Sequence, residues 1–491
     1  MSLGYGSWSK QQIIAGVLGV LMPPLVSAAN WTLSPSVTLA ESYTDNVTLS
    51  SDNSPKESQW ITQIIPGLSL TGQGRELDFS LAYHMQSLFY AGNSERNNIN
   101  HQLDSRAKAS LISRFLFLDA SANVSQQVVN PDEKFSANNL AIVSNRRDVA
   151  TVSLSPYIET RLSKNILAHI RATQDRVMYG EKSSLNSTSN KYEMRLSSAS
   201  KGDWSWGLRL SSQDINYEED VLNPNQTDEK NRDAVFNLGY KISPKIQLTA
   251  LSGHEEYEYQ HSAISNQPKD NYWQAGAIWK PNSRSTLTLG GGKRFFGRTW
   301  YLNVQQKGRR NTLQVGYNES LSSRRQLQVQ QRLFYQYDET TGAPVTDPVS
   351  GSILLFPLDV LVPTNEVFID RRANMRWSFS TRKTTTSIYA SHSKREYQLS
   401  NTDETVTTAA FIWDLKLTKR NNIAFNANRQ NTKTDVGDDS YSTVSLKLNR
   451  KLGRHVNSAF VLLHSRRNTD VTGDTNDYTE NQLSANLDMK W

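Results

Sequence analysis

The last nine residues of the chain alternate strictly between apolar and polar side chains. The apolar positions run up to a tryptophan that is the final residue. Successive side chains of a β-strand point to opposite faces, so a period of two predicts a strand with one apolar and one polar face. The apolar residues are Leu483, Ala485, Leu487, Met489 and Trp491.

The same alternation recurs from Trp31 onward, in segments of about ten residues separated by polar turns, as in membrane barrels. The mean hydropathy of −0.59 hides it, because only every second residue of such a strand is apolar. No stretch after the N-terminus approaches the roughly 18 apolar residues of a membrane helix. The clearest apolar faces are Leu77, Phe79, Leu81, Tyr83 and Met85; Ala150, Val152, Leu154 and Ile158; Ala234, Phe236, Leu238, Tyr240 and Ile242; Trp273, Ala275, Ala277 and Trp279; Ala373, Met375, Trp377 and Phe379; Ala409, Phe411, Trp413, Leu415 and Leu417.

The pattern predicts an all-β fold, a transmembrane antiparallel β-barrel of about 22 strands within a range of 18 to 24. Short polar turns alternate with longer loops, and such barrels place short turns in the periplasm and long loops outside. Ten short turns and one strand at each terminus give this even number. The turns lie near residues 72–75, 113–114, 162–165, 201–203, 243–245, 281–283, 307–310, 381–383, 418–421 and 451–454, and examples of long loops are 180–189, 218–230 and 432–440.

Two segments depart from the strand pattern. Residues 1–28 predict a cleaved signal peptide, because Lys10 precedes a short apolar run and small residues end at Ala28. The barrel then occupies residues 29–491. Residues 321–366 contain four prolines and an apolar stretch, which argue against a regular central strand. This segment either enters the lumen as a constriction, caps the barrel or adds one hairpin.

Chemical motifs are absent from the sequence. It has no cysteine, and its eight histidines are dispersed without metal-ligand spacing. We therefore expect no enzyme activity, no cofactor and no metal. The net charge of +7 is small for 491 residues, and Lys and Arg are scattered along the chain, so we expect no nucleic-acid binding.

The polar faces of the predicted strands carry charges of both signs. If the apolar residues face lipid, these charges face the lumen, where they either favour anions slightly or pair across strands. The acidic positions are Asp78, Asp119, Glu193, Asp233, Asp414 and Asp488. The basic positions are Arg106, Lys108, Arg171, Arg195, Arg209, Lys241, Arg376, Lys416 and Lys447.

Two resemblances extend this interpretation. The final strand resembles the C-terminal strand of bacterial outer-membrane barrels that the barrel-assembly machinery reads. Most of residues 29–491 resemble the outer-membrane proteins associated with exopolysaccharide gene clusters and the PEP-CTERM sorting system. The residues that carry the second resemblance are Ser34 to Val37, Tyr43 to Val47, Ile65 to Leu70 and Arg294 to Trp300.

The second resemblance implies a barrel in the bacterial outer membrane that exports exopolysaccharide, with outer-membrane lipid, periplasmic export proteins and the polysaccharide as partners. Phe295, Phe296 and Trp300 would then either stack on sugar rings or belong to the interfacial aromatic girdle. The alternatives to an export channel are a general diffusion porin and a structural or adhesive surface barrel.

Overall fold

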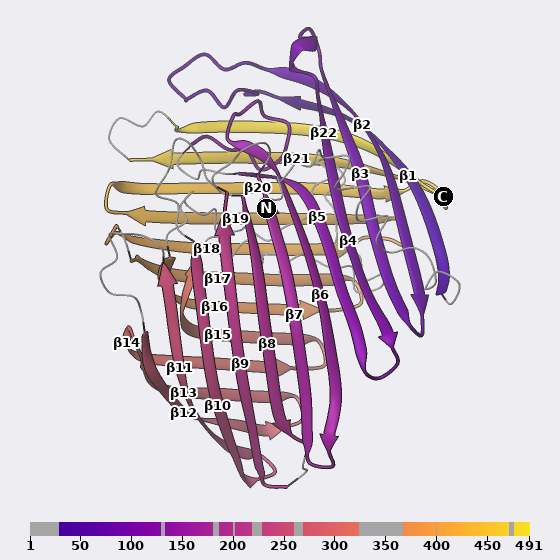
Figure 1. Cartoon of the computed structure of the whole chain (residues 1–491). Coiled ribbons are helices and arrows are strands. Elements are labelled where there is room, and N and C mark those ends of the chain that lie inside the picture. Colours follow the sequence, from indigo (N-terminus) through magenta and orange to yellow (C-terminus); the bar gives the residue numbers. More distant parts are fainter. Residues whose placement is uncertain are drawn as a thin grey trace, which may run out of the picture.

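The computed structural model describes residues 29–128, 133–179, 186–199, 202–218, 228–259, 269–323, 367–398, 400–470 and 476–491. These residues form one antiparallel sheet of 22 strands that closes on itself. Figure 1 shows the early strands crossing in front of the late ones, as the opposite walls of a barrel. The predicted transmembrane β-barrel and its strand count are confirmed.

The strands follow one another around the barrel in chain order, and a short 3-10 helix, η2 (Ser94–Arg96), lies between the third and fourth. The strand bounds are β1 (Ala29–Thr44), β2 (Gln59–Gly74), β3 (Leu77–Tyr90), β4 (Asn98–Ile112), β5 (Leu116–Val128), β6 (Arg146–Ser163), β7 (Ile166–Met178), β8 (Ser187–Ser198), β9 (Trp204–Tyr217), β10 (Glu229–Ser243), β11 (Ile246–Tyr259), β12 (Lys269–Asn282), β13 (Ser285–Arg294), β14 (Gly297–Lys307), β15 (Asn311–Ser323), β16 (Val367–Ser380), β17 (Thr384–Tyr397), β18 (Asp403–Lys416), β19 (Asn421–Thr434), β20 (Gly437–Lys451), β21 (Val456–Thr469) and β22 (Tyr478–Lys490).

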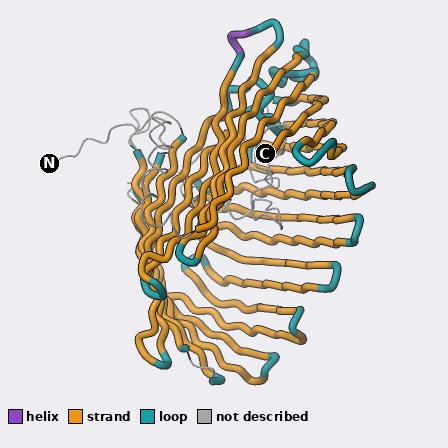
Figure 2. Tube along the Cα trace, turned by 90° about the vertical axis from the view of Figure 1, so that its right-hand side faces the viewer, coloured by secondary structure: helices purple, strands orange, loops and turns teal. Residues whose placement is uncertain are grey.

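Pairing between the first and last strands closes the barrel. The register of β1 on β22 runs antiparallel from Ser36 opposite Lys490 to Thr44 opposite Gln482. Figure 2 shows the strands from the side as one continuous sheet. Closure leaves no strand edge unpaired, which a barrel in lipid requires because lipid offers no hydrogen-bond partner to the backbone.

The connections are shorter at one end of the barrel than at the other. Ten connections of two to five residues lie at the end that also holds the start of β1 and the end of β22. In bacterial barrels this is the periplasmic end. The connections at the opposite, extracellular end include residues 45–58 and 129–145.

The prediction of a long loop at residues 432–440 is wrong. Residues 432–440 do not form a loop, because β19 continues to Thr434 and β20 begins at Gly437 after a two-residue turn. Lys433 and Asp438 lie opposite each other on these strands and form an ion pair of 2.8 Å. The polar residues therefore mark where the strands leave the apolar layer, and both strands continue into water. Gly437 has a φ of +155°, which suits the tight turn.

Two other predicted segments fall mainly outside the described residues. The expected signal peptide, residues 1–28, lies outside them altogether. Of the expected insert at 321–366, the first three residues complete β15, and residues 324–366 lie outside the described part.

Most of the predicted apolar faces form the exposed outer surface of the barrel. The face through Leu77, Phe79 and Leu81 differs, because these three residues are buried in a cluster with Leu103 and Ala107 of β4. Phe236, Trp273 and Phe411 are 48%, 55% and 37% exposed, and Phe236 and Trp273 lie among other exposed apolar residues on neighbouring strands. A continuous exposed apolar surface of this kind needs lipid around it. The chain is a β-barrel of the bacterial outer membrane. In the described residues, no helix is long and apolar enough to cross a membrane.

The adjacent residues Asn237 and Leu238 of β10 provide a test, because they point to opposite faces. Leu238→Arg would place a cation in lipid and should lower the free energy of unfolding by about 2–4 kcal/mol. Asn237→Arg, on the luminal face, should change it by less than about 1 kcal/mol. Urea unfolding in lipid vesicles measures both. Equal destabilisation by the two substitutions would contradict the assignment of faces.

Candidate functional site

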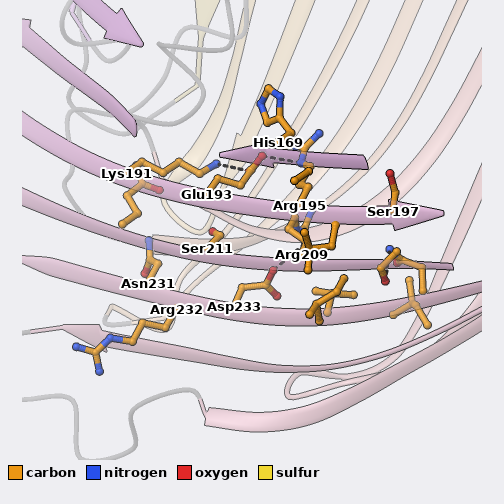
Figure 3. A pocket seen from close by; sticks show the side chains of 18 of the residues that line it. His169, Lys191, Glu193, Arg195, Ser197, Arg209, Ser211, Asn231, Arg232 and Asp233 are labelled. Carbon is orange, nitrogen blue, oxygen red and sulfur yellow. Dashed lines mark hydrogen bonds and ion pairs between the residues drawn. The ribbon is translucent and has the colours of Figure 1, made fainter. Parts of the chain in front are cut away.

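A cavity of about 850 Å³ lies against the luminal wall between β6 and β13. Figure 3 shows Glu193, Arg195, Arg209 and Asp233 close together on neighbouring strands, whereas Arg232 points away from them. The polar and charged residues that line it are Glu159, His169, Lys191, Glu193, Arg195, Ser197, Arg209, Ser211, Gln213, Asn231, Arg232, Asp233, Asn237, Tyr257, Tyr272, Gln274 and Arg294.

Strand alternation assembles this wall. On β8, Lys191, Glu193 and Arg195 occupy every second position, whereas Tyr192 between them is 60% exposed on the outer surface. On β9, Arg209 follows the same rule beside the outward Leu210. Because neighbouring strands are hydrogen-bonded in register, the luminal residues of β8, β9 and β10 meet side by side.

The centre of the cavity wall contains linked ion pairs. The Glu193 carboxylate forms an ion pair with the Arg195 guanidinium, with an N–O distance of 2.6 Å. Its other oxygen lies 3.6 Å from the Lys191 ammonium. On the next strands, the Arg209 guanidinium contacts Asp233 at 2.8 Å, and the Tyr272 hydroxyl donates to the other oxygen of the same carboxylate at 2.8 Å. The two carboxylates therefore hold the cations in place while part of each cation stays open to the lumen.

Arg294 forms the upper side of the cavity, where β13 ends. Its guanidinium makes a two-oxygen ion pair with Glu255, which is only 1% exposed. The same guanidinium lies 5.5 Å from the ring centre of Tyr272 and 5.1 Å from that of Phe296. Stacking and bidentate pairing fix its position, as is typical of a buried arginine.

The predicted luminal cations occupy different sectors of the barrel. The strand registers put all nine on the face opposite the exposed apolar residues, but only Arg195 and Arg209 line the cavity. Arg171 lies nearby on β7, bound to Asp119 at 2.9 Å. Arg106 and Lys108 belong to β4, Lys241 lies beside the periplasmic turn after β10, and Arg376, Lys416 and Lys447 belong to β16, β18 and β20.

The three aromatic residues proposed for sugar stacking do not come together in the lumen. Phe295 and Phe296 form the turn between β13 and β14, with ring centres 5.0 Å apart. Trp300 is 62% exposed, and it pairs with Gly291 on the face that also carries Trp273. Trp300 therefore belongs to the outer aromatic surface.

The glycine run in β13 has a packing role that the sequence did not reveal. A Cβ on Gly290 would meet the hydroxyl of Tyr301, and a Cβ on Gly291 would meet the Trp300 ring. The run therefore lets aromatic side chains from β14 lie across both faces of β13. Sequence reasoning also missed Tyr272 and Glu255, because their role depends on a partner in another strand.

The described part of the loop between β5 and β6, residues 133–145, folds into the barrel; we call this segment the inward loop. Leu140 is fully buried among Val47, Ile61, Leu88 and Tyr90. The Tyr90 hydroxyl donates to the Leu140 carbonyl at 3.0 Å. The inward loop therefore packs onto the β1–β2 connection and onto the luminal side of β2 and β3.

Polar contacts tie the inward loop to the last strands as well. The amide of Asn138 donates to Gln482 of β22 at 2.6 Å, and the hydroxyl of Ser136 donates to Glu480 at 3.2 Å. The Arg467 guanidinium of β21 donates to the Glu133 carbonyl at 2.5 Å. The inward loop thus joins strands from both ends of the chain, in a sector of the lumen separate from the cavity.

The described residues contain no group of three or more His, Asp or Glu side chains placed to hold a metal ion.

No known protein family and no curated protein matches the sequence. Three similar solved structures are titled as iron receptors or transporters. The apoprotein form of the FrpB iron transporter from Neisseria meningitidis has a TM-score of 0.53 at 10% identity, covering 95% of this chain and 82% of that one. Another structure of the FrpB iron transporter has a TM-score of 0.50 at 9% identity, covering 95% and 83%. A mutant of the ferric enterobactin receptor from Pseudomonas aeruginosa, in complex with enterobactin, has a TM-score of 0.50 at 7% identity, covering 94% and 82%.

These three solved structures share the fold of this chain, and they correct the expected function. The expectation of an exopolysaccharide export channel is wrong, and its alternatives gain no support. The similar barrels are titled as an iron transporter and a ferric enterobactin receptor, and none as an export channel or a general porin. The sequence pattern could not separate these functions, because the alternation reports lipid contact and is the same in all such barrels.

The packing of the inward loop can be tested at Leu140. Leu140→Ala should lower the free energy of local opening by about 2–3 kcal/mol, because it leaves a cavity in a fully buried cluster. Hydrogen exchange of residues 133–145 measures this opening. As a control, Val436→Ala removes a side chain that is 73% exposed in a turn and should leave exchange unchanged. Unaltered protection in the Leu140 variant would refute the packing.

Proposed function

We propose that this protein is an outer-membrane transport receptor, without catalytic activity, that binds a small anionic iron chelate of the siderophore class in its luminal cavity. The observation that carries the proposal is the cavity wall, on which basic and aromatic groups converge from β8 to β13. The shared fold with an iron transporter and a ferric enterobactin receptor is consistent with it.

The size of the cavity favours a small solute over a polymer. Pockets for small molecules measure about 300–1,000 Å³, and this one measures about 850 Å³. Such a volume accommodates a compact chelate of several aromatic or carboxylate arms. The inward loop packs in another sector, so it leaves this wall open to a ligand.

The charges of the wall favour an anion. Four basic residues on the luminal face line the cavity, namely Lys191, Arg195, Arg209 and Arg294, against three acidic ones, Glu159, Glu193 and Asp233. Glu193 and Asp233 each hold an arginine in place. Guanidinium groups held in this way bind catecholate or carboxylate oxygens through short charge-assisted hydrogen bonds. Tyr257 and Tyr272 supply aromatic surface beside them.

We also propose that β22, together with the Trp491 that follows it, is read by the barrel-assembly machinery during insertion. The resemblance to the PEP-CTERM-associated outer-membrane proteins also stays a proposal, which concerns ancestry and implies nothing here about export.

Binding of ferric enterobactin to the refolded protein tests the function. Tryptophan quenching should show saturable binding to the native chain. Arg195→Gln combined with Arg209→Gln should weaken it by about tenfold or more, because each guanidinium contributes charge-assisted hydrogen bonds. The iron-free ligand and ferric citrate, measured in parallel, show which anionic arms the cavity accepts.

The matched control is Lys416→Gln, which removes a cation from the luminal face of β18, away from the cavity. It should bind as the native chain does. The proposal fails if no ferric chelate binds the native chain, or if the control loses affinity as much as the arginine variant does.

A further inference from the structure

The two ends of the barrel carry opposite charge. In the described residues, the ten periplasmic turns contain twelve Lys or Arg and only two acidic residues, Glu76 and Asp203. The described extracellular connections contain ten acidic residues and three basic ones. The basic turn residues are Arg75, Arg114, Lys164, Lys245, Arg284, Arg309, Arg310, Arg382, Lys383, Lys419, Arg420 and Arg454.

The basic residues are scattered along the sequence, but they are not scattered in the folded barrel. They recur in the sequence at the spacing of the hairpins, so the closed barrel gathers them into one ring; we call it the periplasmic basic ring. All twelve side chains are exposed. Of these twelve cations, only Arg75 forms an ion pair within the described residues, and its partner is Glu76. Unneutralised cations at this density repel one another and attract a counter-anion.

The periplasmic basic ring lies at the edge of the lipid layer, because exposed apolar side chains flank its cations directly. Ile112 and Phe115, which are 53% and 41% exposed, flank Arg114. Ile242 and Ile246 flank Lys245 in the same way. A side chain in hydrocarbon next to a cation in the same turn places that cation at the level of the lipid headgroups.

We propose that the periplasmic basic ring binds the phosphodiester headgroups of anionic phospholipids in the inner leaflet of the outer membrane. Guanidinium groups match phosphate oxygens with paired hydrogen bonds, and each cation near an anionic surface adds a favourable contribution. In the described part of the chain, cations occur in nine of the ten turns, all around the circumference. An annulus of lipid surrounds the barrel in this way, whereas a protein partner would contact one sector.

The experiment measures lipid binding by native mass spectrometry of the whole chain, with phosphatidylglycerol or phosphatidylcholine added to the detergent. The native chain should retain more phosphatidylglycerol, and added salt should reduce this preference. Replacing Arg309, Arg310, Lys419 and Arg420 with Gln should lower the affinity for phosphatidylglycerol by about tenfold. These substitutions lie in exposed turns, and heat-modifiable mobility on gels verifies that the variant is folded.

A second set of four substitutions gives the matched control. Lys293, Arg298, Arg429 and Arg466 lie on the extracellular side, and their replacement with Gln removes the same charge. This variant should keep the preference for phosphatidylglycerol. Equal loss in both variants would overturn the proposal, because the effect would then come from net charge alone.

Two competitors distinguish other sources of negative charge. Excess glycerol 3-phosphate should not displace the lipid; if it does, the ring binds free phosphate and the proposal is overturned. Polyglutamate imitates an acidic protein. If polyglutamate binds in a manner that depends on the four periplasmic cations while phosphatidylglycerol shows no preference over phosphatidylcholine, the ring is a protein-binding surface and the lipid proposal is wrong.

Discussion

The hydrogen-bonding demand of the peptide backbone governs this structure. In lipid, every N–H and C=O group must find a partner within the protein, because hydrocarbon offers none. The chain meets this demand by pairing β1 with β22, so that all 22 strands have two neighbours. Closure then gives the barrel two separate surfaces. One faces lipid and one faces the lumen, and strict alternation assigns each residue to one of them.

The luminal surface carries the features that distinguish this barrel. On one wall, Glu193, Asp233 and Glu255 each hold an arginine, and basic and aromatic groups converge on a cavity of about 850 Å³. In another sector, the inward loop joins early strands to late ones through Leu140 and Asn138. A barrel of 22 strands has a wide lumen, and in outer-membrane transporters with this number of strands the lumen is plugged.

The sequence predicted the wall of the barrel well, because lipid imposes a period of two that is visible residue by residue. The faces through Phe236 and Phe411 and the strand ending near Trp491 are examples. The interior was harder to predict. The pairing of Arg294 with Glu255 joins β13 to β11, and the contacts of Asn138 span 344 residues of sequence. Such contacts depend on barrel register and curvature, which no local pattern encodes. Function was missed for the same reason, since the lipid-facing pattern is common to barrels that transport different solutes.

The assignment of the two faces is central, because both the luminal cavity and the lipid-facing surface depend on it. The chain has no cysteine, so single cysteines along β10 can carry spin labels without a background signal. Collisions with oxygen, which concentrates in lipid, and with a water-soluble nickel complex would be measured from residue 231 to residue 240. The account predicts that oxygen accessibility is high at even positions, such as Phe236 and Leu238, and that nickel accessibility is high at odd ones, such as Asp233. The same accessibility at even and odd positions, or an inverted alternation, would contradict it.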